Sequence, residues 1–212
     1  MSHHQSYDSR YCDTCGKANK ACICEYIVSI DATTELIVLQ HESEQNHPLG
    51  SAKILALTLK NTHFLIGEDF SCHATLNQLI SDPNYQHCIL YPSEKAQSLN
   101  KLLNHQENNK KLRLILLDGT WKKAYKMWQL STNLHALPCV SLPSDLKGEY
   151  KIRKAPSENA LSTVEAGYHA LSIIEPTVDF APLLRAFEQM IQFQIDQMPP
   201  GVFERNYLST SD

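Results

Sequence analysis

An aspartate follows a run of six largely apolar residues near the middle of the 212-residue chain. Residues 112–117 are predicted to form a buried strand, and Asp118 follows at once. Gly119 then permits a sharp turn into a helix predicted over residues 120–130. A carboxylate held at such a strand end can act as a general base or can orient a bound ligand. The structural alternative is that Asp118 only caps the helix.

The start of this predicted helix combines an aromatic ring with positive charge. Trp121 can stack on the ring of a ligand, or it can simply pack against the protein. Backbone N–H groups at a helix start also favour an anionic group. Three lysines have no acidic residue near them in the sequence, so salt bridges of the helix explain them poorly: Lys122, Lys123 and Lys126.

A second stretch, residues 147–165, carries a further cation and a capping pattern. Arg153 can form a bidentate clamp on a carboxylate or a phosphate. Ser162 and Glu165 have the spacing of a capping box at the start of a helix predicted over residues 162–174. Glu165 is therefore either part of a site or a purely structural residue.

Polar residues also follow the strand predicted over residues 36–39. His47, Ser51 and Lys53 are placed to meet a ligand beyond the end of this strand. The alternative is a loop in which Ser51 only marks the start of a helix predicted over residues 51–59.

A turn is predicted after the strand over residues 88–91. Pro92 fixes that turn, and Ser93 is predicted to cap a helix over residues 93–103. A functional use of this segment would therefore come through its backbone groups.

Four of the seven cysteines lie within thirteen residues, in the pattern C-x2-C-x6-C-x-C. Two thiolates on a tight turn can approach one ion at about 2.3 Å, and four thiolates would form a closed, structural zinc site. An iron–sulfur cluster, disulfides and free thiols are the alternatives, although the reducing cytosol that we expect without an export signal disfavours disulfides. The candidate ligands are Cys12, Cys15, Cys22 and Cys24.

Apolar runs alternate with helical patterns over residues 31–212, which we expect to form one domain beside a cysteine-rich appendage over residues 1–30. Continuously apolar strands favour an α/β fold, with a mostly parallel sheet and helices on both faces. Ligands then bind outside the carboxyl ends of the strands, so the residues after positions 39, 91, 117 and 140 should surround one cleft. The other predicted elements are strands over 64–66 and 136–140 and helices over 76–80 and 181–197.

Composition and charge exclude some classes of protein. No apolar run approaches the roughly 18 residues of a membrane span. The net charge of −4 argues against a nucleic-acid partner, but residues 110–154 hold ten basic and three acidic residues. This segment is either a phosphate-facing surface or a set of solvated charges that neighbours cancel in space.

Several of these segments together resemble the DTW-domain family, named for an Asp-x-Thr-Trp signature that Asp118, Thr120 and Trp121 match. The resemblance covers nearly the whole chain and implies a SPOUT-like knotted α/β fold. It also implies transfer of the 3-amino-3-carboxypropyl group of S-adenosylmethionine to N3 of a uridine in the tRNA variable region, with release of methylthioadenosine. The matching segments are residues 11–24, 47–50, 91–93, 118–127 and 150–165.

The resemblance gives each candidate residue an expected role. Asp118 is the base for uridine N3, or the anion that orients uridine or cofactor, and Arg153 holds the cofactor carboxylate. Thr120 and Trp121 complete the catalytic set, with Trp121 stacking on a base or shaping the pocket. We expect the cofactor to contact Tyr91, Pro92, Ser93, Leu117, Asp118, Gly119, Thr120, Leu161, Ser162, Thr163 and Glu165, and tRNA to contact His47, Lys53, Lys122, Lys123, Lys126 and Lys154.

Two other functions stay open at this point. A methyltransferase that uses S-adenosylmethionine on RNA would release S-adenosylhomocysteine, and a zinc-dependent RNA-binding module would do no chemistry. In the proposed transfer, zinc would shape an RNA-facing appendage and take no part in the reaction. The expected partner is tRNA, no membrane is involved, and the expected location is the cytoplasm.

Overall fold

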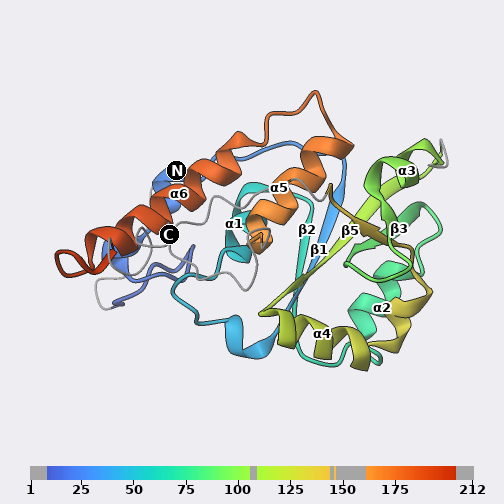
Figure 1. The fold of residues 1–212 in the computed structure, drawn as a ribbon, viewed down its shortest axis with the longest axis horizontal. Coiled ribbons are helices and arrows are strands. Elements are labelled where there is room, and N and C mark those ends of the chain that lie inside the picture. The colour runs from blue at the N-terminus through green and yellow to red at the C-terminus, as the bar shows by residue number, and fades with distance from the viewer. Residues whose placement is uncertain (1–8, 106–108, 144–145, 147–160, 204–212) are drawn as a thin grey trace, which may run out of the picture.

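Six strands form one sheet at the centre of the molecule (Figure 1). The computed structural model describes residues 9–105, 109–143, 146 and 161–203. All neighbouring strands in this sheet run parallel, which confirms the predicted α/β class with a parallel sheet. From one edge to the other, the strands are β2 (Thr62–Ile66), β1 (Glu35–Gln40), β5 (Lys111–Asp118), β3 (Tyr85–Leu90), β6 (Cys139–Ser141) and β4 (Gln97–Ser98).

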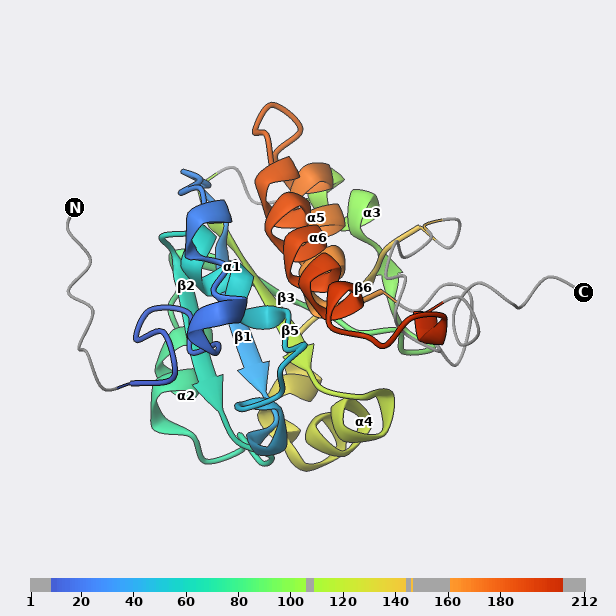
Figure 2. The same cartoon turned by 90° about the vertical axis from the view of Figure 1, so that its left-hand side faces the viewer.

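Helices cover both faces of this sheet, as Figures 1 and 2 show. On one face, α6 packs against α5 and α1, and α3 contacts α5. The opposite face is covered by α2 and α4. The helices are α1 (Ala52–Thr58), α2 (Ala74–Ile80), α3 (Leu99–Asn104), α4 (Trp121–Leu130), α5 (Thr163–Ile174) and α6 (Ala181–Asp196), with short 3-10 helices η1 (Asn19–Ala21), η2 (Cys24–Tyr26), η3 (Glu42–Glu44) and η4 (Thr132–Ala136).

The central strands are buried on both sides. In β1, Leu36 and Val38 belong to the core under α1, α5 and α6. Ile37 and Leu39 belong to the second core, under α2 and α4. None of these four side chains is exposed to solvent. Burial of both faces explains why the strand is a continuous apolar run and does not alternate with polar residues.

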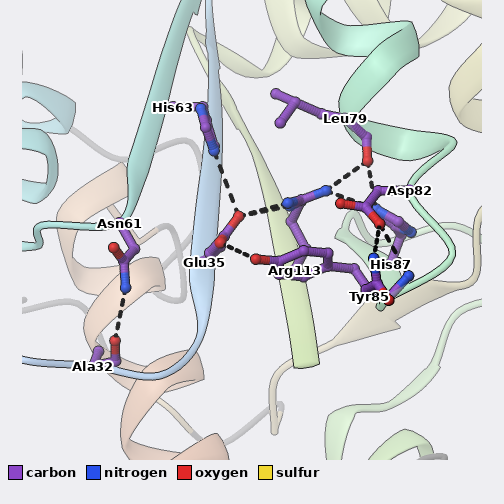
Figure 3. A network of polar contacts seen from close by, with 10 residues as sticks. Ala32, Glu35, Asn61, His63, Leu79, Asp82, Tyr85, His87 and Arg113 are labelled. Atoms are coloured by element: carbon purple, nitrogen blue, oxygen red, sulfur yellow. Dashed lines mark hydrogen bonds and ion pairs between the residues drawn. The ribbon is translucent and has the colours of Figure 1, made fainter. Parts of the chain in front are cut away.

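A polar network joins three strands at the amino edge of the sheet (Figure 3). Two guanidinium nitrogens of Arg113 donate to Oε2 of Glu35 at 2.7 and 2.9 Å, and Tyr85 donates its hydroxyl proton to Oε1 of the same carboxylate. The guanidinium carbon of Arg113 lies 3.5 Å from the centre of the Tyr85 ring. Nη1 of Arg113 donates to the carbonyl of Leu79 at 2.6 Å, which satisfies another of its donors.

The cysteine-rich N-terminal segment packs against the main domain. Gly16 has a φ of 72°, in the left-handed region that favours glycine, and this allows the tight turn between the first two cysteines and the second two. Cys15 and Ile23 are buried in the same core as residues of α6, and η2 contacts α6 directly. The four-cysteine cluster is therefore held against α6 by apolar contacts.

The helix predicted over residues 93–103 is shorter than expected, and Ser93 does not cap it. The helix begins at Leu99, and the hydroxyl of Ser98 accepts the cap hydrogen bond from the Lys101 N–H at 3.3 Å. The preceding residues form a turn and the short strand β4, which pairs with β6. Pairing with β6 satisfies backbone groups that a longer helix would have satisfied internally.

The strand predicted over residues 136–140 starts later than expected. Residues Thr132–Ala136 form η4, and β6 begins at Cys139, directly after Pro138. Pro138 has no N–H to donate to the sheet, which explains why strand pairing begins after it.

The segment that connects β6 to α5 contains residues 147–160, which lie outside the described residues. The structure therefore does not show the knot that the family resemblance implies. Among the described helices, none is both long enough and apolar enough to cross a lipid bilayer.

Candidate active site

A cavity of about 350 Å³ opens at the carboxyl edge of the sheet. It lies where β5, β3 and β6 end and where α4 and α5 begin, which is the usual ligand position in parallel α/β sheets. The structure brings together here residues that the sequence analysis assigned to a cofactor or catalytic site. They are Tyr91, Pro92, Leu117, Gly119, Trp121, Leu161, Ser162 and Thr163.

The sequence analysis missed much of the apolar wall of this cavity. Leu142, Pro143 and Leu146 line it from the segment after β6. Their position after a predicted strand was the available signal, because the residues following position 140 were expected at the cleft. Ala166 lines the cavity from the first turn of α5, and nothing in the sequence distinguished it from a core alanine.

Asp118 lies behind the wall of this cavity, with 7% of its surface exposed. Thr163 Oγ1 donates a hydrogen bond to one carboxylate oxygen at 2.5 Å, and Gln40 Nε2 donates to the other at 2.8 Å. Thr163 lines the cavity, as do both chain neighbours of Asp118. The carboxylate is thus held by two hydrogen bonds, one of which comes from a residue of the cavity wall.

Burial raises the pKa of Asp118 above its ordinary value. The hydrogen bonds from Thr163 and Gln40 favour the ionised form and oppose this rise, whereas the nearby charge of Glu44 adds to it. A carboxylate with a raised pKa binds a proton more strongly than an exposed aspartate does, which suits a general base.

The interpretation of Asp118 as the cap of α4 is wrong. Thr120 is the N-cap residue, and its hydroxyl accepts a hydrogen bond from the Lys123 N–H at 3.4 Å. Gly119 makes the turn possible through its small size, because a Cβ at this position would lie 3.1 Å from the Cβ of Lys123. Asp118 is therefore free of the capping role and keeps both oxygens for Thr163 and Gln40.

The four N-terminal cysteines form a compact cluster, and none of them lines this cavity. Their sulfur atoms all lie within 4.8 Å of one another. Cys12 and Cys24 sulfurs are 3.6 Å apart, and Cys15 and Cys22 sulfurs are 3.8 Å apart. These separations are too long for disulfides, and they match the edge of about 3.8 Å that four sulfurs at 2.3 Å from one tetrahedral ion would form. The one-residue gap in the second pair does not prevent this arrangement.

Comparison with known proteins agrees with this arrangement. The family model of the DTW domain matches residues 9–195. The chain belongs to the DTW domain family. It is 28% identical to tRNA-uridine aminocarboxypropyltransferase 2 of Drosophila melanogaster, over 87% of this chain and 75% of that protein. It is 27% identical to the protein of the same name from Mus musculus, over 93% of this chain and 67% of that protein.

A plant relative covers a larger share of both chains. The DTW domain protein described here is 29% identical to tRNA-uridine aminocarboxypropyltransferase A of Arabidopsis thaliana, over 94% of this chain and 85% of the relative. No solved structure matches the chain.

Two of the three lysines of α4 in this DTW domain have acidic partners. Lys123 Nζ lies 2.7 Å from Glu44, and Lys126 Nζ lies 2.8 Å from Glu68. The interpretation that these lysines lack acidic neighbours is therefore wrong for both. The acids come from segments far away in the sequence, so helix spacing could not reveal them. Lys122 is exposed and has no ion-pair partner in the described part of the chain.

Glu165 has the structural role that its spacing predicted. Its N–H donates to Ser162 Oγ at 3.4 Å, and its carboxylate accepts from the Ser162 N–H at 2.7 Å, which completes a capping box for α5. Glu165 does not line the cavity of the DTW domain.

Ser51 stands directly before α1. Its hydroxyl accepts a hydrogen bond from the Val164 N–H at 3.4 Å, which joins the starts of α1 and α5.

The remaining candidates lie outside the cavity wall or outside the described residues. Ser93 does not line the cavity, and its buried hydroxyl has no hydrogen-bond partner among the described residues. His47 is exposed and accepts a hydrogen bond from the Leu49 N–H, and Lys53 is exposed with its ammonium 6.0 Å from the Phe64 ring centre. Arg153 and Lys154 lie outside the described residues.

Proposed function

We propose that this DTW domain protein transfers the 3-amino-3-carboxypropyl group of S-adenosylmethionine to N3 of a uridine in the variable region of tRNA, releasing methylthioadenosine. The observation that carries the proposal is the carboxylate of Asp118, fixed at the end of β5 by Thr163 and Gln40 beside a cavity. Relatives that align over most of the chain carry the name of this transferase.

The cavity has the size and the walls that S-adenosylmethionine, as a substrate, needs. Its volume of about 350 Å³ falls within the range of about 300–1,000 Å³ for small-molecule sites. Leucine and valine side chains, among them Leu116 and Val140, can hold the purine ring, and backbone groups near Tyr91 can bind its polar edge. Arg153 is our candidate for the carboxylate of the amino-acid moiety, because an arginine binds a carboxylate through two hydrogen bonds.

The transfer requires a nucleophilic N3 and a correctly placed γ-carbon. The bond from N3 to the γ-carbon forms as the bond from that carbon to sulfur breaks, and the electron pair stays on sulfur. A sulfonium is a good leaving group, so activation by a metal is unnecessary. The choice of the γ-carbon over the methyl group is a matter of how the cavity positions the substrate.

Asp118 and Thr163 supply the base in this proposal. The N3 proton passes to the Thr163 oxygen as Thr163 gives its own proton to Asp118, because Thr163 lines the cavity and its hydroxyl already donates to the carboxylate. The raised pKa of the buried carboxyl favours this uptake of a proton. The alternative role for Asp118 is that of an anion that only orients uridine or cofactor.

The four-cysteine cluster is proposed to hold one structural zinc ion. Its support is the donor set of four thiols and sulfur separations that suit a tetrahedral ion. Four protein ligands leave no open position, so zinc would stabilise an RNA-facing appendage over residues 1–30 and take no part in the transfer to a substrate held by residues 31–212. A SPOUT-like knot and a cytoplasmic location complete this proposal.

Mass spectrometry of tRNA nucleosides tests the proposed reaction. The protein is incubated with tRNA and with S-adenosylmethionine labelled in the aminocarboxypropyl group, and the expected product is a uridine that carries the label. Asp118→Asn should lower turnover at least 100-fold, because general-base catalysis contributes about 10² to 10⁴, while the Kd for tRNA stays within about threefold. Asp31→Asn is the matched control, since the Asp31 side chain is 85% exposed and lies in a surface ion pair with Lys60.

The products separate this reaction from the other two functions. Methylated uridine together with S-adenosylhomocysteine would replace the proposal with a methyltransferase. Binding of tRNA with no modified nucleoside, and with no effect of Asp118→Asn on any measured property, would indicate an RNA-binding module without catalysis.

A further inference from the structure

Three aromatic residues lie along one side of α4. Trp121, Tyr125 and Trp128 are four and three residues apart, so they form a single stripe on the helix. Trp128 packs partly against the second core, but Trp121 and Tyr125 are not among the buried residues of α4, which are Ala124 and Met127. Trp121 is 48% exposed and Tyr125 is 58% exposed. Packing of the helix therefore does not account for these two large rings.

One end of this aromatic stripe is at the cavity. Trp121 lines the cavity, and so does Tyr91, whose ring stacks on Trp128 with ring centres 4.8 Å apart and an interplanar angle of 19°. Trp128 also contacts His135, with ring centres 4.6 Å apart, and His135 makes a hydrogen bond of 2.7 Å with the Trp128 carbonyl. The Trp128 ring thus contacts two other rings of the protein.

Tyr125 lies between Trp121 and Trp128 along the stripe, but its ring contacts differ from those of the Trp128 ring. Within the described part of the chain, no aromatic ring stacks on it. Tyr125 follows the cavity residue Trp121 by four positions on α4, which is about one helical turn. The ring of Tyr125 is therefore exposed close to the cavity residue Trp121 and, among the described residues, is not covered by another aromatic ring.

A positive charge accompanies the exposed rings. Lys122 occupies the helix position next to Trp121, is exposed, and has no ion-pair partner among the described residues, whereas Lys123 and Lys126 both pair with glutamates. Exposed aromatic rings beside a cation form the kind of surface that binds unpaired nucleotides, through stacking and phosphate contacts. The charge therefore favours RNA as the occupant of this surface.

We propose that Tyr125 stacks on an unpaired nucleotide of tRNA adjacent to the uridine that enters the cavity, and that Lys122 contacts a neighbouring phosphate. The inference rests on the proposed function, which places the reacting uridine at the cavity beside Trp121. One helical turn, about 5.4 Å along the axis, separates Tyr125 from Trp121, so the base next to the uridine can reach Tyr125. Because every base has a face that can stack, this contact tolerates different sequences.

Binding of RNA to Tyr125 variants tests the inference without requiring turnover. The Kd is measured for tRNA and for a short single-stranded RNA that contains uridine, at several salt concentrations. Tyr125→Ala should weaken both complexes about tenfold, within the range reported for loss of one stacked base, and Tyr125→Phe should stay within twofold of the unaltered protein. The dependence of affinity on salt should not change in either variant, whereas Lys122→Ala should reduce that slope by about one.

Leu130→Ala is the matched control for this experiment. Leu130 is 38% exposed and lies on α4, on the side opposite the aromatic stripe by helical spacing. It should bind both RNAs as the unaltered protein does. Because Tyr125 and Leu130 are both exposed, neither substitution should change the melting temperature, which checks that each variant is folded.

The outcomes distinguish this inference from the proposed function. Unchanged RNA affinity of Tyr125→Ala would overturn the stacking role, even if the protein forms the expected nucleoside. A loss in Tyr125→Phe as large as that in Tyr125→Ala would overturn it as well, because the hydroxyl would then be responsible. A selective loss in Tyr125→Ala would support the nucleotide surface, and the nucleoside assay would separately decide whether the reaction occurs.

Discussion

Thr163 Oγ1 donates a hydrogen bond of 2.5 Å to Asp118 Oδ1, across 45 residues of sequence. Thr163 is the first residue of α5, and Asp118 is the last residue of β5. Their contact joins a helix start to a strand end at the cavity. Burial favours the neutral form of Asp118 and this hydrogen bond favours the ionised form, so the Thr163 hydroxyl helps to set the pKa of the proposed base.

Replacement of Thr163 by valine tests this relationship. Thr163→Val removes the donor and keeps a similar shape, so the pKa of Asp118 should rise further and the acid limb of the kcat/KM profile should move to higher pH. Turnover at neutral pH should fall about 100-fold or more, as in Asp118→Asn, because valine lacks the hydroxyl that passes the N3 proton to Asp118. Thr163→Ser keeps the hydroxyl and should retain the profile. An unmoved acid limb in Thr163→Val would remove Thr163 from the control of Asp118.

Asp118 should also affect how the stability of the protein depends on pH. Its pKa is raised in the folded state, so the folded protein binds the proton more strongly than the unfolded chain does. Stability that is present below the unfolded pKa, about 3.9, is then lost as pH rises through the folded value. Asp118→Asn should therefore gain free energy of unfolding relative to the unaltered protein between pH 4 and pH 7, as urea titrations can measure. Asp31→Asn, at an exposed position, should show no such trend. If the free energy of unfolding of Asp118→Asn followed pH in parallel with that of the unaltered protein, the raised pKa of Asp118 would be contradicted.

The sequence predicted those parts of the fold that depend on local pattern. The strand that ends in Asp118 is predictable because a largely apolar run, here residues 112–117, is typical of a strand buried on both faces. The same pattern, with the rule for parallel sheets, placed the cleft at the correct edge. The capping box of Ser162 and Glu165 was predicted from a spacing of three residues, which needs no knowledge of the rest of the chain.

The sequence could not predict contacts made between distant segments. The partners of Lys123 and Lys126 are 79 and 58 residues away in the chain, so no helix rule could reveal them. Gln40 also contacts Asp118 only because β1 and β5 pair in register. The sequence pattern predicts that Ser93 caps a helix, but Gln97 and Ser98 pair with β6 and the helix begins only at Leu99.

The ion pair of Lys123 changes what its replacement should do. Lys123→Ala leaves the half-buried Glu44 without its partner, and the measured slope of tRNA affinity against salt should change little because this lysine is already paired in the free protein. Lys122→Ala should reduce the slope by about one, and the double variant should therefore lose about one unit, not two. A loss of two units in the double variant would show that Lys123 leaves Glu44 to contact tRNA.

Metal analysis tests the cysteine cluster. Denaturing the purified protein in the presence of a colorimetric chelator should release about one equivalent of zinc per chain, the amount that one four-thiolate site holds. Cys24→Ser removes one ligand and should reduce the release and lower the melting temperature, because the cluster carries Cys15 and Ile23 into the core shared with α6. Cys72→Ser is the control, since Cys72 is an exposed free thiol outside the cluster. Less than half an equivalent from the unaltered protein would defeat the zinc assignment.

Arg113 should matter for stability and not for the proposed reaction. Its network (Figure 3) includes Glu35 and Tyr85, the first residues of β1 and β3, whereas the cavity lies where the strands end. Arg113→Ala leaves the Glu35 carboxylate and the Leu79 carbonyl without this partner, and the free energy of unfolding should fall by about 3–5 kcal/mol.

Burial opposes ionisation of Glu35, but hydrogen bonds from Tyr85 and Arg113 outweigh the effect of burial and lower the pKa of this carboxyl. The ionised Glu35 therefore stabilises the protein above its unfolded pKa, about 4.3, and this stabilisation is lost as pH falls through the folded pKa. Glu35→Gln should therefore be less stable than the unaltered protein at pH 7, and the difference should shrink in acid. Replacing Arg113 and Glu35 together by methionine should recover much of the loss, since two apolar side chains leave no charge unpaired. Turnover per folded molecule should stay unchanged in all three variants, and a selective loss of turnover would mean that this network acts on the cavity.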